Sequence, residues 1–162
     1  MSAPSLFTDG VFQARVRCEC CNLPTLHVPV DRYGAQHFEW AERVCPLCEW
    51  ESVALTAQGQ AATIDSGAER NGGISLAEAR ANFERYLSMY DPDKLEPWML
   101  GPPSAALLLR KRAFRDSCAA LLSVSGRERW DAFGLARACE SALAAQADAD
   151  RERLDRSGQD AT

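Results

Sequence analysis

The chain has 162 residues, of which 46% are hydrophobic and 25% charged, as is typical of a folded globular protein and not of a disordered one. Its net charge of −5 argues against broad phosphate binding, so nucleic acid is not the expected partner. No stretch approaches the roughly eighteen apolar residues of a membrane-spanning helix, and the first residues do not resemble a signal peptide. We therefore expect a cytoplasmic protein whose seven cysteines serve metal or thiol chemistry and not disulfide bonding.

The first part of the chain has the alternation of a small antiparallel sheet. After a flexible terminus expected at residues 1–10, apolar and polar residues alternate over residues 12–16 and 26–30. Pro29 cannot donate to a neighbouring strand, which indicates an edge position for the second run. Apolar residues of one parity at 38–44 predict a further strand that leads to the second pair of cysteines.

A helix is predicted after residues 51–73, which have few large apolar residues and are expected to be mostly loop. Ser75 and Glu78 form an S-x-x-E capping box that opens the helix. Asp91-Pro92 is expected to stop it. We expect this helix to pack on the sheet.

A helical hairpin is predicted for the last part of the chain, after a proline-rich connector. Its helices are expected at residues 104–122 and 127–147, separated by Ser125-Gly126. From Asp148 onward an extended helix and a frayed tail are both open, and residues 157–162 are expected to be a flexible terminus.

Four cysteines have the spacing of metal ligands. Cys18 and Cys21 are separated by two residues, as are Cys45 and Cys48, so each pair can wrap two thiolates around one cation. Four thiolates form the closed tetrahedral shell that is typical of structural zinc, with no open position for water or substrate. Iron fits such a shell equally well in geometry, and availability favours zinc. We therefore predict a structural Zn²⁺ site within a zinc ribbon.

Cys20 is a fifth cysteine in a region with four ligand positions. Cys18 and Cys21 are the predicted ligands because their spacing matches that of the second pair. In addition, Asn22 accepts the left-handed conformation that usually follows such a turn. Cys20 could instead replace one of them, or be a reactive thiol, although a spare thiol within the turn is the simplest interpretation.

The cysteine motifs resemble those of the cysteine-rich CPCC family of small bacterial domains. The family's CPCC motif stands here as Cys18-Glu19-Cys20-Cys21, and its CPxCxW segment as Cys45-Pro46-Leu47-Cys48-Glu49-Trp50. Its Gly/Asn-rich turn and its SLxEAxxNF helix start match residues 71–73 and 75–83. The resemblance covers about residues 12–92, with Glu19 in place of the family's Pro, Asn22 in place of its Gly, and a longer segment between the cysteine pairs. It implies a small metal-binding domain.

These observations predict an α+β fold, with a small zinc-ribbon-like antiparallel sheet and a packed helix, followed by a helical hairpin. The CPCC-type zinc-binding domain is expected to cover residues 11–92, and residues 93–156 to form a helical extension packed on it. The metal would replace core that so small a sheet cannot supply.

Catalytic motifs are missing from the sequence, which has no Ser/His/Asp arrangement, HExxH, Walker loop or GxGxxG. His27 and His37 are expected to be structural, and Cys118 and Cys139 to be packing residues on helix faces. We therefore predict a non-enzymatic zinc-binding protein that binds another protein, one concrete form being a bacterial immunity protein that neutralises a cognate toxin.

Two other functions remain open. A zinc-ribbon accessory module could bind nucleic acid or transcription machinery through the basic residues at 110–115, and a thiol redox or metal sensor could use Cys20. An acidic patch near the second cysteine pair (Glu39, Glu42, Glu49 and Glu51) could meet a basic protein, although ordinary solubilising charge also explains it. Trp40 and Trp50 beside it are either core residues or, if exposed, interface anchors.

Overall fold

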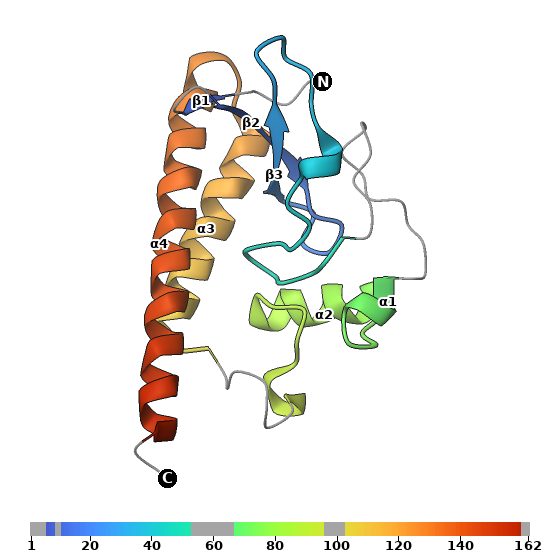
Figure 1. Cartoon of the computed structure of the whole chain (residues 1–162), viewed down its shortest axis with the longest axis vertical. Coiled ribbons are helices and arrows are strands. Elements are labelled where there is room, and N and C mark those ends of the chain that lie inside the picture. Colours follow the sequence, from blue (N-terminus) through green and yellow to red (C-terminus); the bar gives the residue numbers. More distant parts are fainter. Residues whose placement is uncertain (1–5, 9–10, 53–66, 96–102, 160–162) are drawn as a thin grey trace. The chain divides into compact units, whose positions relative to one another are not determined.

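The computed structural model describes residues 6–8, 11–52, 67–95 and 103–159 (Figure 1). The chain divides into two compact units, Met1–Met89 and Tyr90–Thr162. The first unit contains the sheet and short helices and the second contains two long helices, so the α+β fold predicted from the sequence is confirmed. The assignment of residues 11–92 and 93–156 to a zinc domain and a packed extension stays a prediction.

The first unit is built on a three-stranded antiparallel sheet in the order β1-β2-β3. Its strands are β1 (Leu6–Thr8), β2 (Val11–Arg17) and β3 (Pro24–Val30). Val16 pairs with Leu26 in the register of β2 and β3, and both side chains are buried. β1 lies within the segment that was expected to be a flexible terminus, and it pairs with β2.

The chain turns back along β3 after residue 30, and here the predicted strand over residues 38–44 is wrong. Phe38–Trp40 forms a short 3₁₀ helix, η1, in which Ala41 N donates to Phe38 O at 3.2 Å. The segment meets β3 through an isolated bridge between Val30 and Gln36, which includes the hydrogen bond from His37 N to Pro29 O at 2.9 Å. The apolar parity of this segment reflects a turn of helix and not a strand.

Two helices complete the described part of the first unit, α1 (Gly67–Arg70) and α2 (Leu76–Tyr86). The Ser75 side chain caps α2 by accepting a hydrogen bond from Glu78 N, as the capping box predicts. Leu87, in a left-handed conformation with φ 55°, ends α2 before the predicted stop at Asp91-Pro92. Pro92–Lys94, in the second unit, forms the 3₁₀ helix η2. The predicted loop falls largely on residues 53–66, which lie outside the described residues.

The second unit is the predicted helical hairpin, formed by α3 (Ala105–Ser123) and α4 (Gly126–Gln159), which lie side by side in Figure 1. The Ser104 side chain accepts a hydrogen bond from Leu107 N and so caps α3, and it also donates to the Asp150 carboxylate at 2.6 Å. α4 extends well beyond residue 147, so the extended helix, and not the frayed tail, is correct. Among the described residues no helix is long and apolar enough to cross a membrane.

Candidate metal centre

The first pair of cysteines lies in the turn between β2 and β3. The Cys18 N–H donates to Leu23 O at 3.0 Å, and the Asn22 N–H donates to Cys18 O at 2.8 Å. Asn22 has a positive φ of 57°, as the sequence predicts, which turns the chain around the two sulfurs. We call residues 18–23 the first knuckle.

The second pair of cysteines repeats this backbone pattern. The Cys45 N–H donates to Trp50 O at 3.0 Å, the Glu49 N–H donates to Cys45 O at 2.9 Å, and Glu49 has a positive φ of 67°. Donors and acceptors therefore occupy the same relative positions in residues 45–50, the second knuckle, as in the first knuckle. Two turns of the same geometry face each other with two sulfurs each.

The structure brings together the four cysteines whose spacing predicts the site. Their sulfurs all lie within 4.8 Å of one another, with Cys18 Sγ 3.6 Å from Cys48 Sγ and Cys21 Sγ 3.9 Å from Cys45 Sγ. A tetrahedron with metal–sulfur bonds of about 2.3 Å has sulfur–sulfur edges of about 3.8 Å. All four side chains are buried, and Cys21, the most exposed of them, is 8% exposed. The donor set and its dimensions therefore fit a tetrahedral metal ion, and the four cysteines could hold one.

The four thiols do not ionise independently. Hydrogen bonding with Cys21, and then with Cys45, raises the pKa of Cys18 well above its usual range. Cys18 acts to lower the pKa of Cys21, but hydrogen bonds with Cys45 and Cys48, together with burial, outweigh it and raise that pKa.

Burial raises the pKa of Cys48 well above its usual range. Cys45 is the exception among the four thiols. Burial by itself would raise the pKa of Cys45, but hydrogen bonds from Cys18, Cys21 and Cys48 lower it well below its usual range. Burial and the neighbouring thiols therefore oppose ionisation of all four cysteines at once. Loss of every thiol proton requires a cation to balance the buried charge.

Polar groups around Cys45 supply hydrogen bonds to its sulfur. The Cys48 N–H donates to Cys45 Sγ at 3.5 Å, and Thr25 Oγ1 lies 3.1 Å from the same atom. Thr25 is fully buried at the start of β3 and also lies 4.0 Å from Cys21 Sγ. Sequence reasoning missed Thr25, although its position four residues after Cys21, where β3 leaves the first knuckle, is a signal that could have identified it.

Cys20 is buried and 4% exposed, but its sulfur is not among the four that meet. Its side chain does act on Cys48, where it contributes to the raised pKa of that thiol. The geometry thus selects Cys18 and Cys21 from the first knuckle and leaves Cys20 beside the cluster.

Glu19 connects the two knuckles. Its carboxylate accepts a hydrogen bond from Trp50 Nε1 at 2.6 Å, and its carbonyl accepts two from the Arg80 guanidinium at 2.8 and 3.1 Å. Trp50 is 1% exposed, so it is a core residue and not an interface anchor. Glu19 therefore joins the second knuckle and α2 to the first.

Asn71 holds the chain that leaves the second knuckle. Its Oδ1 accepts from Glu51 N at 2.8 Å and its Nδ2 donates to Glu51 O at 3.0 Å, which imitates the pairing of a neighbouring strand. Gly72 and Gly73 follow with positive φ values of 65° and 82°, a conformation that L side chains rarely adopt. The Asn-Gly-Gly turn thus supports the metal centre. The composition of the turn alone does not reveal this role.

The segment that follows α2 also reaches the second knuckle. The Met89 N–H donates to Cys48 O at 2.8 Å, and Asn82 Nδ2 donates to Met89 O at 2.8 Å. The Ser88 hydroxyl donates to the Glu49 carboxylate. Arg80 of α2 thus bonds to the first knuckle, and the residues that follow α2 bond to the second.

The other residues considered from the sequence lie apart from the four sulfurs. His27 lies on β3 and His37 in the segment that follows β3. Cys118 is fully buried, as expected of a packing residue, and Cys139 is half-buried. In the cluster at 110–115, Arg110 and Arg112 are exposed but Lys111 is 3% exposed, so these cations do not share one solvent face.

The acidic residues near the second knuckle divide into two groups. Glu49 and Glu51 are engaged with Ser88 and Arg70, respectively. Glu39 and Glu42 are exposed, and Glu39 contacts His37 at 3.0 Å. Trp40 is 67% exposed beside them.

Comparisons with protein families, curated proteins and solved structures find no match to the chain.

Proposed function

We propose that the protein is a non-enzymatic zinc-binding protein of the CPCC type in which the ion is structural. The observation that carries this proposal is the convergence of four buried cysteine sulfurs at tetrahedral spacing. Zn²⁺ favours four thiolates, and the closed shell leaves no coordination position for a substrate or an activated water. Zinc is preferred to iron because of its availability, and metal analysis distinguishes the two.

A structural role also follows from how the first unit is built. The strands β2 and β3 have seven residues each, and the second knuckle is flanked by a single bridge, between Val44 and Glu51. So small a sheet buries too little apolar surface to fix two turns by itself. Metal binding then supplies folding free energy directly, because the site does not exist in the unfolded chain.

We further propose that the protein acts by binding another protein, as an immunity protein that neutralises a toxin would. The first unit has 11 acidic and 7 basic residues, a net charge of −4, which favours a basic partner. Tyr33 and Trp40 are 80% and 67% exposed on this unit, and aromatic side chains are enriched at the centres of protein interfaces.

The partner is tested by co-purification. The tagged chain is co-expressed with the product of each adjacent gene, and captured complexes are remeasured with zinc-loaded protein by stopped-flow fluorescence, which gives the association rate. We expect one product to bind, with an association rate that falls as salt rises because opposite charges steer the encounter. Zinc-loaded, folded protein that binds no adjacent-locus product would overturn the immunity role.

A further inference from the structure

Two large aromatic side chains are exposed in one short connection of the first unit. Tyr33 and Trp40 lie between β3 and the second knuckle and are 80% and 67% exposed. The connection is held to β3 by the hydrogen bond from His37 N to Pro29 O at 2.9 Å. An aromatic surface fixed in this way is a candidate for contact with another molecule.

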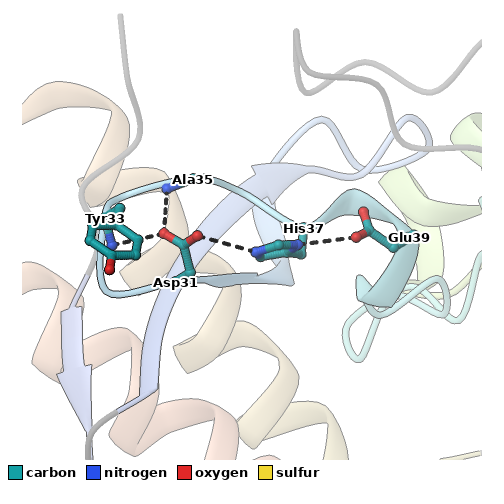
Figure 2. Close-up of polar contacts among 5 residues, drawn as sticks. All are labelled: Asp31, Tyr33, Ala35, His37 and Glu39. Carbon is teal, nitrogen blue, oxygen red and sulfur yellow. Dashed lines mark hydrogen bonds and ion pairs between the residues drawn. The ribbon is translucent and has the colours of Figure 1, made fainter.

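The His37 ring already covers one face of the Trp40 indole. The imidazole of His37 stacks on the Trp40 indole, with ring centroids 4.6 Å apart and an interplanar angle of 16°. Its Nδ1 lies 3.0 Å from Glu39 Oε1 and its Nε2 lies 3.6 Å from Asp31 Oδ2. Figure 2 shows the ring between the two carboxylates. We call these two carboxylates and the indole the cage.

The Asp31 side of the cage is held by its own turn. Asp31 Oδ1 accepts hydrogen bonds from Tyr33 N at 2.8 Å and from Ala35 N at 2.9 Å (Figure 2). Asp31 Oδ2 therefore stays directed toward the His37 ring. The guanidinium of Arg32, in the same connection, lies over the Tyr33 ring at 4.8 Å.

The cage favours a planar cation. A neutral imidazole has one N–H and can donate to one carboxylate only, whereas the imidazolium donates to both. In agreement, the hydrogen bond with Glu39, and then the contacts with Asp31, raise the pKa of His37. Guanidinium is the other planar cation in proteins: it is always charged, bridges carboxylates and stacks on aromatic faces.

We propose that the cage is the docking surface for an arginine side chain of a basic partner protein, whose guanidinium takes the place of the His37 ring between Asp31 and Glu39 and over Trp40. The inference rests on the proposed protein-binding role and names its surface and the chemistry of the partner. His37 is then an internal competitor. When neutral it can donate to only one of the two carboxylates and so competes less with the guanidinium than when it is protonated.

The competition makes docking depend on pH. The charged groups that face His37 are Asp31 at the end of β3 and Glu39 in η1. Hydrogen bonds from the backbone of Ala35 and Tyr33, and then from His37, lower the pKa of Asp31; the Glu39 backbone N–H, and then His37, lower the pKa of Glu39. Both carboxylates thus stay ionised between pH 6 and 8, and only His37 changes charge. Apparent affinity scales with the fraction of the competent form. For a histidine pKa at or above about 6.5 that fraction rises at least about fourfold between pH 6.0 and 8.0.

The experiment titrates isotope-labelled, zinc-loaded full-length protein with N-acetyl-arginine amide and follows the His37 and Trp40 ring signals by NMR. The matched probe is the citrulline compound, which has the same length and no charge. We expect saturable shifts at both rings with the arginine compound, an affinity at least about fourfold higher at pH 8.0 than at pH 6.0, and no saturable shift with citrulline. Absence of shifts at both pH values, or equal shifts with citrulline, would overturn the inference.

Variants separate the cage from general electrostatics. Trp40→Ala and Glu39→Gln should weaken binding, whereas Glu84→Gln, an equal charge change at an exposed position of α2, should not. His37→Asn should remove the difference between pH 6.0 and 8.0. Equal effects of Glu39→Gln and Glu84→Gln would contradict the proposal.

The test of the cage and the test of the immunity role can fail separately. If the zinc-loaded chain captures an adjacent-locus protein but shows no arginine-dependent shift at His37 and Trp40, the inference fails and the proposed function stands. If arginine binds in the cage while no adjacent-locus protein is captured, the inference stands and the immunity role fails.

Discussion

The first knuckle continues two strands of seven residues each, whereas the second knuckle is flanked by a single bridge between Val44 and Glu51. Both turns place a residue with positive φ after the last cysteine, but the first uses Asn22 and the second uses Glu49. Asparagine tolerates this conformation, whereas for most L residues it costs roughly 1–2 kcal/mol. The first knuckle is thus determined locally and the second is not.

The second knuckle obtains from distant residues what its own sequence lacks. Trp50 bonds to Glu19, Asn71 pairs with the backbone of Glu51, and Met89 donates to the carbonyl of Cys48. One metal ion would join a turn that forms locally to a turn that tertiary contacts must hold. The comparison predicts that substitutions of the ligands act alike on both knuckles, whereas substitutions of supporting residues do not.

The largest expected effect comes from the ligands themselves. Cys21→Ser and Cys48→Ser should each lose the metal and the fold of the first unit, because structural zinc contributes on the order of 10 kcal/mol to such domains. Cys20→Ser, with the same atom change one residue from Cys21, should keep both. Metal content and circular dichroism measure this, and metal loss in Cys20→Ser would show that the ligand set is different.

Asn71→Ala should weaken the second knuckle next most strongly. Two backbone groups of Glu51 lose their partner, at about 1–3 kcal/mol each, so zinc affinity should fall roughly a hundredfold in competition with a chromophoric chelator. The nearly isosteric Asn71→Asp should be no better, because its carboxylate would face the Glu51 carbonyl. Wild-type affinity in Asn71→Asp would refute the role of the Nδ2 donor.

Trp50→Phe tests the link between the two knuckles. The variant removes the indole N–H that binds the Glu19 carboxylate, and a hydrogen bond to a charged group contributes about 1.5–3 kcal/mol. We expect zinc affinity to fall at least about tenfold. Glu19→Gln, which keeps a neutral acceptor, should have a smaller effect, and the reverse order would contradict the assignment.

Asn22→Ala gives the smallest expected effect, because apart from an exposed hydrogen bond from Arg17 at 3.4 Å it changes only a backbone preference. Alanine at φ 57° should cost roughly 1 kcal/mol, whereas Asn22→Gly should be close to neutral because glycine adopts this conformation freely. Urea unfolding followed through NMR signals of β2 and β3 measures the difference. Equal stability of the two variants would show that backbone strain does not determine the first knuckle.

What the sequence could predict follows the same division. The cysteine spacing, Asn22 and the capping box at Ser75 are local signals, and the structure places each as expected. η1 was mistaken for a strand because three apolar positions cannot distinguish a period of 2 from a helical turn. Thr25 and Asn71 act through contacts 20 residues away in sequence, which no local pattern records.

The most direct test of the structural metal site is the metal content of wild-type protein purified without added metal, with tertiary structure recorded before and after chelation. We expect about one zinc ion per chain, loss of the tertiary signal of the first unit when zinc is removed, and its return when zinc is restored. A well-folded first unit without any bound metal would contradict the account and make the five clustered cysteines candidates for thiol chemistry.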